Sequence, residues 1–198
     1  MPAKKEKSGD KKITSLKGML LVATPTMGDP RFHKSVIFVC NHDSKGAMGL
    51  VINNILPGLA FENMIEHFNI PISDPEKAAK TPVLGGGPVE TARGFIIHKT
   101  GYHISDTIDI TDDFAVTGTV DALKAVARGE GPDPMIFILG YAGWGKGQLE
   151  RELQENAWLT VEPDSALLFD VPPEHKWKMA LGKIGIEPGH YSNQAGHA

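Results

Sequence analysis

Hydrophobic residues in this chain gather in short runs that glycine, proline and polar residues separate. Runs of four to eight apolar residues between turn-forming residues are typical of buried β-strands. The short connection Asn41–Gly46 between two such runs predicts an antiparallel hairpin. Strands are expected at Met19–Thr24, Ser35–Cys40, Ala47–Asn53, Gly94–Lys99, Thr107–Ile110, Met135–Leu139, Trp158–Val161 and Ala166–Asp170.

Other segments place their apolar residues at helical spacing, so that one face of each would pack on a sheet. Thr119 is the expected N-cap of one of these helices. Strands and helices mix without a strict βαβ alternation or an internal repeat, which favours the α+β class. Helices are expected at Leu59–Phe68, at Thr119–Arg128, from Gly147 or Gln148 onward, and at Pro172–Ile184.

Two segments are rich in glycine, which tolerates positive φ angles and the close approach of another backbone or a ligand. Gly140–Glu152, with the sequence GYAGWGKGQLERE, is predicted to be a turn that leads from a central strand into a helix. Gly85–Pro88 is predicted to be a second tight turn, and Pro82–Gly87 contains the short apolar step before it. Glycine in regular structure costs roughly 0.5–1 kcal/mol relative to alanine, so both segments indicate a structural or functional requirement.

The length of 198 residues fits one domain, which we expect at residues 14–186, with flexible tails at 1–13 and 187–198. No apolar run is long enough to cross a membrane and no signal peptide is visible, so a cytoplasmic protein is expected. The first 17 residues carry a formal charge of +4, which leaves −8 on the remaining 181. An acidic body argues against direct binding to nucleic acid, because that affinity comes from lysine and arginine neutralising phosphates.

Known chemical motifs are incomplete in this sequence. Gly140, Gly145 and Lys146 satisfy G-x-x-x-x-G-K, but Gly147 stands where a phosphate-binding loop needs serine or threonine for magnesium. The eight histidines have no metal-site spacing, and the single cysteine, Cys40, excludes an intramolecular disulfide and is expected to be a small buried hydrophobe. We therefore assign no cofactor, no metal and no catalytic residue.

Three segments and a later short one resemble the AlgH/YqgE family of bacterial proteins. They are Gly18–Asn53, Leu84–His98 and Gly140–Leu159, followed by LLFD at Leu167–Asp170 and a closing tryptophan helix. The resemblance implies a bifurcated mixed sheet curled into a pseudo-barrel with flanking helices. It also implies a largely uncharacterised family, in which one branch has a genetic link to exopolysaccharide control but no established DNA-binding element, substrate or catalytic residue.

Two functions follow as hypotheses. The first is a regulatory protein that binds a protein partner or a small ligand and influences transcription indirectly. The second is an enzyme of unknown reaction, with a small-molecule site where the turns Asn41–Gly46, Gly85–Pro88 and Gly140–Gln148 meet. A cleft beside His42 or Glu150 would favour the enzyme, whereas burial of Tyr141 and Trp144 as anchors of the sheet would remove its motivation. The candidate ligand-binding residues are His42, Gly86, Gly87, His98, Tyr141, Trp144, Lys146, Gln148 and Glu150.

Overall fold

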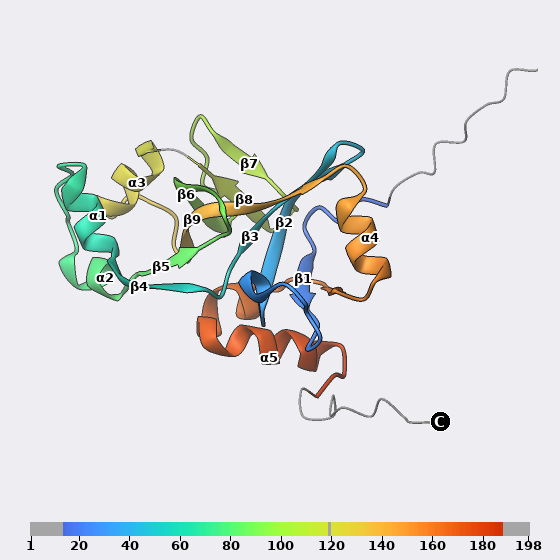
Figure 1. Ribbon diagram of the computed structural model, residues 1–198. Helices are drawn as coiled ribbons and strands as arrows, with labels where there is room; N and C mark the ends of the chain where they lie inside the picture. The colour runs from blue at the N-terminus through green and yellow to red at the C-terminus, as the bar shows by residue number, and fades with distance from the viewer. Residues whose placement is uncertain (1–13, 119, 188–198) are drawn as a thin grey trace, which may run out of the picture.

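The computed structural model describes residues 14–118 and 120–187 (Figure 1). The expected tails lie outside these ranges except for Glu187, and so does the expected N-cap Thr119. The strands are β1 (Leu20–Ala23), β2 (Val36–Asp43), β3 (Gly46–Val51), β4 (Ile55–Ala60), β5 (Pro82–Gly85), β6 (Val89–Lys99), β7 (Thr107–Asp109), β8 (Phe114–Thr117), β9 (Met135–Gly145) and β10 (Trp158–Val161). The helices are η1 (Pro30–Phe32), α1 (Phe61–His67), α2 (Pro75–Lys80), α3 (Val120–Ala127), α4 (Gln148–Gln154), η2 (Ala166–Asp170) and α5 (Pro173–Lys183).

The described strands form one curled sheet in the order β10-β1-β2-β3-β9-β6-β8-β7, with β5 and then β4 branching from β9. All pairs are antiparallel except β5 with β9, so the sheet is mixed. The expected β2–β3 hairpin is confirmed. The α+β single domain with a bifurcated, curled sheet and flanking helices is confirmed as well.

Strand β9 is the branch point of the sheet. Its first half lies between β5 and β6, and its second half pairs with β3 through Gly46 to Gly49. Gly140, with φ of 73°, separates the two halves. Ile136 and Ile138 face the inner core before it, and Tyr141 faces the same core after it, so the alternation of faces shifts by one residue. Glycine at such a bulge accepts the positive φ without strain.

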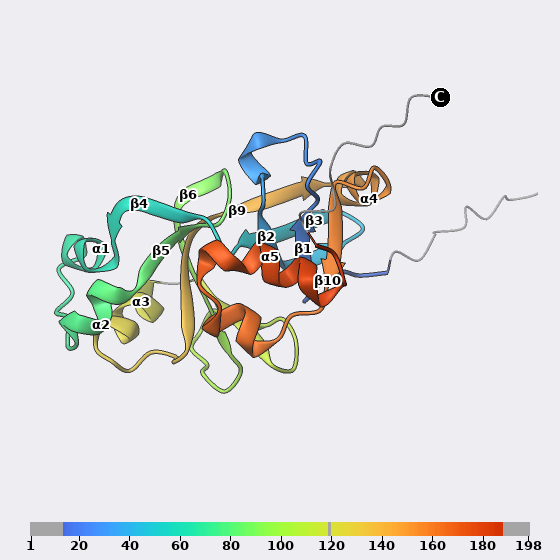
Figure 2. The same cartoon turned by 90° about the horizontal axis from the view of Figure 1, so that it is seen from below.

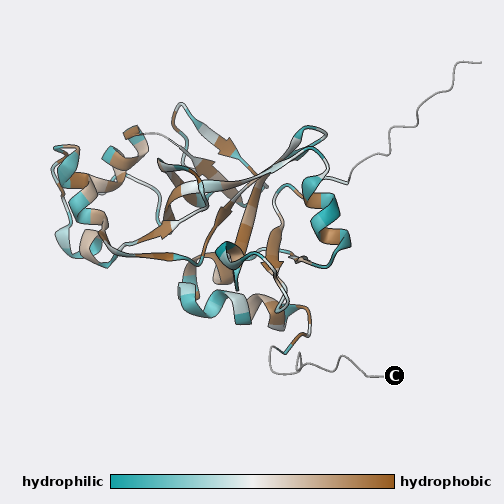
Figure 3. Ribbon diagram, in the orientation of Figure 1, coloured by the Kyte–Doolittle hydropathy of each residue, from teal (hydrophilic) through white to brown (hydrophobic). Residues whose placement is uncertain are grey.

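The inner face of the curled sheet holds the largest core cluster, in which Leu20, Val22 and Phe38 meet side chains of η2 and α5. Helix α5 lies across β1 and β2 (Figure 2). The Trp177 indole N–H donates to the carbonyl of Ala23 at 2.8 Å, which fixes the helix on β1. Figure 3 shows the hydrophobic residues concentrated on these central strands.

Two further clusters pack on the rest of the sheet. Helix α4 contributes Leu149 to a cluster that includes Trp144 and Trp158. The helices α1, α2 and α3 gather at the opposite end of the molecule and cover Phe137 of β9 (Figure 1). The sheet is therefore covered by helices at both ends and along β1, which leaves part of its inner face open.

Three sequence expectations are wrong in detail. Gly140–Gly145 is the second half of β9, because β3 supplies a partner strand that no local pattern reveals. Ala166–Asp170 is the short π-helix η2, since its apolar side chains pack into the inner core under α5. Leu59 and Ala60 end strand β4, although a helix was expected to begin at Leu59, because β4 pairs with β5. Strands β5 and β8 and helix α2 were not predicted, since they depend on pairing with β9 and β6 and on packing against α1.

Candidate functional site

The open part of the inner face forms the largest of the described hollows, with a volume of about 760 Å³. Most of its wall is apolar, and the wall is formed by residues of six strands or by residues next to their ends. Most of the apolar side chains in the wall belong to the inner core cluster. Ligand sites in proteins are typically apolar concave hollows of this size with a few polar groups. The apolar wall consists of Cys40, Met48, Phe95, Ile108, Ile110, Val116 and Tyr141.

Polar side chains line the same cavity, and two of them are cations. Lys17 Nζ donates to the carbonyl of Asp109 at 3.1 Å. Arg93 lies over the Phe95 ring, 5.1 Å from its centroid, and pairs with Glu90 at 3.0 Å. The one acidic side chain among the lining residues is Asp106. The cavity lining thus carries one net positive charge, although the whole chain carries −4.

Cys40 lies in the wall of the cavity as a buried, neutral thiol. Burial raises its pKa to about 12, although the nearby Lys17 ammonium acts in the opposite direction. Its Sγ lies 3.6 Å from the carbonyl oxygen of Phe38. Because nucleophilic cysteine chemistry needs the thiolate, this geometry gives Cys40 a packing role.

His98 is joined to the cavity by a chain of hydrogen bonds. Its Nδ1–H donates to the carbonyl of Lys99 at 2.8 Å, so the neutral ring accepts at Nε2 from the Thr117 hydroxyl, also at 2.8 Å. Thr117 in turn accepts from Thr107, which lines the cavity and accepts from the backbone of Ile104. Burial lowers the pKa of His98, which keeps this fully buried ring neutral.

The two glycine-rich segments lie directly against each other. A Cβ on Gly86 would stand 2.3 Å from the carbonyl oxygen of Gly140, and one on Gly87 would stand 2.2 Å from the carbonyl carbon of Tyr141. Atoms cannot approach so closely without displacement of the backbone. The glycines therefore permit two backbones to cross where the sheet branches.

Trp144, Trp158 and helix α4 are joined by one carboxylate. Both indole N–H groups donate to Glu152 Oε2 at 2.8 Å, and Gln148 Nε2 donates to Glu152 Oε1 at 2.9 Å. The side-chain oxygen of Gln148 accepts the backbone N–H of Gly145 at 3.0 Å. These polar atoms satisfy one another and fix α4 on the end of β9.

His42 is held by a second network, in which its side chain is 1% exposed. Nδ1 accepts the backbone N–H of Leu16 at 3.0 Å, so the proton of the neutral ring is on Nε2 and is donated to Glu150 Oε1 at 3.1 Å. Both ring nitrogens are therefore occupied. The arrangement ties the segment before β1 to the β2–β3 hairpin and α4.

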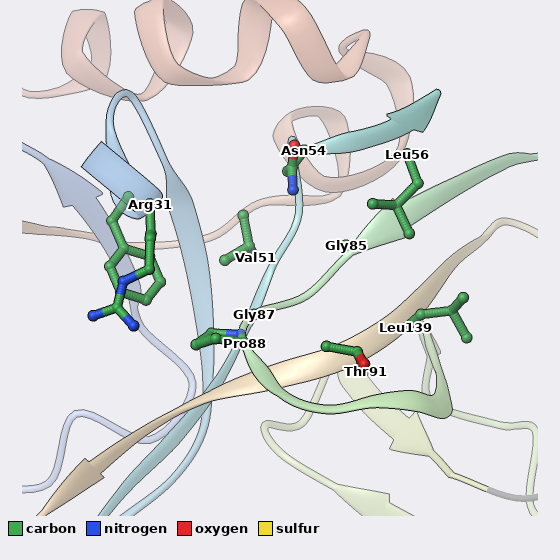
Figure 4. Close-up of a pocket in the computed structure, with 10 residues that line it drawn as sticks. Arg31, Val51, Asn54, Leu56, Gly85, Gly87, Pro88, Thr91 and Leu139 are labelled. Atoms are coloured by element: carbon green, nitrogen blue, oxygen red, sulfur yellow. The ribbon is translucent and has the colours of Figure 1, made fainter. Parts of the chain in front are cut away.

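A smaller hollow of about 220 Å³ lies where Gly85–Pro88 crosses β9. Figure 4 shows Arg31 on one side of it and Leu56 and Leu139 on the other. It shares Arg31, Phe32 and Pro88 with a neighbouring hollow of about 410 Å³ beside Trp144 and Glu152. Arg31 is paired with Asp29 at 2.7 Å, so its charge is already engaged at this surface.

The structure separates the candidate residues into distinct places. Tyr141 lines the inner cavity, and His98 reaches it only through the two threonines. Gly87 lines the smaller hollow, and Trp144 and Gln148 line its neighbour. Lys146 is exposed, Gly86 is covered by β9, and His42 and Glu150 pair with each other. Sequence analysis missed the cations Lys17 and Arg93, whose meeting on the inner face depends on long-range strand pairing.

Within the described ranges, no group of three or more histidine, cysteine or acidic side chains is placed to hold a metal ion. In the same ranges, no helix has the length and apolar character needed to span a membrane.

A family model described as AlgH-like matches residues 20–189. The chain belongs to the AlgH-like family. This confirms the resemblance carried by the glycine-rich segments. A UPF0301 protein of Bradyrhizobium is 47% identical over 189 residues, covering 92% of this chain and 88% of the relative. A UPF0301 protein of Rhodospirillum rubrum is 45% identical over 186 residues, covering 92% and 94%.

Solved structures agree with the AlgH-like assignment. The solution structure of AlgH from Pseudomonas aeruginosa has a TM-score of 0.76 and 40% identity, covering 93% of this chain and 97% of that one. A crystal structure from Corynebacterium diphtheriae, with a TM-score of 0.67 and 20% identity, covers 89% and 91% and shares the fold. None of these names states an activity, so the function has to be argued from the site.

Proposed function

We propose that this AlgH-like protein acts by binding a small ligand in the cavity on the inner face of its sheet. The observation that carries the proposal is the cavity itself, about 760 Å³ in volume, with an apolar wall and a few convergent polar side chains. A hollow of this kind is the default ligand site in a protein. Six strands hold its wall, so the site is largely preformed.

The enzyme hypothesis receives less support from the same geometry. Its candidate side chains are already engaged with neighbouring groups. His42 bonds to Glu150 and to the backbone of Leu16. Trp144 and Gln148 both bond to Glu152. Catalysis needs a nucleophile or base within reach of a reacting atom. Cys40, the one thiol in the cavity wall, is held neutral by burial.

In this proposal the protein influences transcription only indirectly, depending on whether the ligand is bound in the cavity. The chain has a formal charge of −4, and direct binding to DNA would need clustered cations on one face. A cytoplasmic location belongs to the same proposal, and cell fractionation with an antibody against the native protein would check it.

A thermal-shift screen of small organic compounds tests the proposed site. Ile108 lines the cavity and is 61% exposed, so Ile108→Trp should narrow the opening without disturbing the core. Ile184→Trp, at the C-cap of α5 and outside the cavity lining, is the matched control because Ile184 is also exposed. A ligand at about 100 times its Kd adds about 2.7 kcal/mol, which raises the Tm by roughly 5–10 °C at this size.

The expected compound stabilises the wild type and Ile184→Trp, and has a much smaller effect on Ile108→Trp. Equal stabilisation of all three proteins would place binding elsewhere and contradict the proposal. A screen in which no compound stabilises the wild type would also count against it.

A further inference from the structure

We infer that the ligand of the inner cavity is an amphipathic monocarboxylic acid, with an apolar body and one carboxylate group. The inference rests on the proposed function and deepens it by naming the class of ligand. It comes from the shape of the apolar wall and from the charges that converge on the same space.

The apolar wall is continuous from the interior to the opening. Val116 and Phe95 are buried in its inner part, Met48 and Tyr141 are partly buried, and Ile108 is exposed at the edge strand β7. Burying apolar area against such a wall is favourable in proportion to the area removed from water. A purely polar ligand would forgo this free energy, so the ligand should carry an apolar chain or ring.

Lys17 supplies a positive charge that the cavity can use. Its ammonium group donates to the carbonyl of Asp109, which is a neutral acceptor. The same ammonium lies close enough to Cys40 to pull the pKa of the buried thiol downward. The electrostatic effect of Lys17 therefore reaches Cys40 in the inner wall of the cavity as well as groups at the cavity edge.

Arg93 supplies the second positive charge, and its present partner Glu90 can be replaced by another carboxylate. Its partner Glu90 is on the exposed part of β6, and both side chains are about half exposed. Exposed ion pairs of this kind contribute little to stability. A ligand carboxylate could replace Glu90 at small cost and could bind the planar guanidinium through two parallel hydrogen bonds. The Phe95 ring under Arg93 would then carry the first part of the apolar body.

The count of charges favours a single negative charge on the ligand. Two cations line the cavity with one acid, Asp106, so the lining is positive by one unit once the ligand has displaced the exposed Glu90 from Arg93. A monocarboxylate neutralises that charge, whereas a dianion such as a phosphate monoester would leave one negative charge in partly apolar surroundings. A cationic amphiphile would meet Lys17 and Arg93 as like charges.

Three probes with the same alkyl chain length distinguish the effect of the headgroup from that of the apolar body. They are decanoate, 1-decanol and decylamine, and each is used below its critical micelle concentration or its solubility limit. The readout is the methyl signal of Met48 in protein labelled with ¹³C-methyl methionine, with exposed Met179 on α5 as the internal reference. Met48→Leu assigns the signal.

Decanoate is expected to shift the Met48 signal and to bind about 10-fold more tightly than 1-decanol, as a charge-assisted hydrogen bond allows, with decylamine weakest. Arg93→Gln and Lys17→Gln should each weaken decanoate about 5- to 30-fold and leave 1-decanol unchanged. Arg31→Gln, an exposed arginine outside the cavity, should change neither probe.

Two results would overturn the inference while leaving the proposed function standing. One is that 1-decanol or decylamine binds at least as tightly as decanoate, as measured from the shift of the Met48 signal. The other is that decanoate binds Arg93→Gln and Lys17→Gln each with the same affinity as the wild type. If none of the three probes moves the Met48 signal, the inference and the proposed cavity site both fail.

Discussion

The rings of Trp144 and Trp158 pack edge to face, with centroids 6.1 Å apart and an angle of 78° between their planes. They come from the end of β9 and from β10, which lie apart in the sheet order. Both indole N–H groups point to the same oxygen of Glu152. One carboxylate on α4 therefore joins two strands that do not pair with each other.

Replacing Glu152 should weaken this junction. Glu152→Ala leaves two indole donors without their acceptor, and we expect a loss of about 2–3 kcal/mol of unfolding free energy. Glu155→Ala, an exposed glutamate at the end of the same helix, should change it by less than about 0.5 kcal/mol. Urea unfolding followed by tryptophan fluorescence measures both, and equal values would contradict the role given to Glu152.

Gly86→Ala tests the crossing of the two glycine-rich segments. The Cβ would meet the carbonyl oxygen of Gly140 at 2.3 Å, so we expect a loss of about 3 kcal/mol or more, or failure to fold. Gly182→Ala is the matched control, because a Cβ there meets nothing within 4 Å inside α5. The control should gain up to about 1 kcal/mol. A folded Gly86→Ala protein of wild-type Tm would refute the close approach.

His42→Ala distinguishes a structural histidine from a ligand-binding one. It removes the acceptor of the Leu16 N–H and the donor to Glu150, so we expect a loss of about 1–3 kcal/mol in stability. Affinity for a cavity ligand should not change. Lys146→Ala, at an exposed position, should alter neither quantity. Loss of ligand binding at unchanged stability would contradict the structural role and show that His42 takes part in binding.

The stability of the protein should fall in mildly acidic solution because of His98. Its pKa in the folded state is lowered from the ordinary 6.5, chiefly by burial, so the unfolded chain binds the proton more readily. Stability is then unaffected by His98 above about pH 7 and decreases as the pH falls below 6.5 toward the folded-state value. Urea unfolding at several pH values measures this dependence. His98→Gln should remove most of the fall in unfolding free energy below pH 6.5, whereas His103→Gln, at an exposed position, should preserve most of that fall.

Cys40 should resist alkylation in the native protein. Its pKa is raised from 9.0 to about 12, so the thiolate fraction at about pH 8 is lower by about 1,000-fold, and the reaction with iodoacetamide should slow at least as much. Unfolding in urea should restore the ordinary rate. Mass spectrometry of timed samples measures it, and rapid labelling of folded protein would show that the thiol is more accessible than the structure indicates.

Local pattern predicted most elements of the fold. The apolar runs that became β1, β2, β3 and β10 need only burial on a sheet, and α5 begins at Pro173, one residue after the expected start of the last helix. Gly140–Gly145 shows where this reasoning stops. Its glycines are compatible with a turn or with a strand that other backbones approach closely, and only the pairing with β3 decides between them.

The candidate site was harder to predict than the fold. The glycine-rich segments attracted attention because glycine costs entropy, and the structure assigns that cost to the crossing of Gly86 and Gly87 over β9. Lys17 and Arg93 stand in ordinary sequence surroundings, and their shared cavity arises from the curl of the whole sheet. Tyr141 was among the sequence candidates because it lies in the glycine-rich segment Gly140–Glu152.

The place of β9 in the chain has a consequence for the protein during its synthesis. Strands β3, β5 and β6 all pair with β9, yet they are made before it, and β7, β8 and α3 still separate β6 from β9. Until residue 145 has left the ribosome, each of these strands presents an unpaired edge, which is the usual starting point of aggregation. Both branches of the sheet must therefore wait for one late segment, and the nascent chain depends on rapid closure once it emerges.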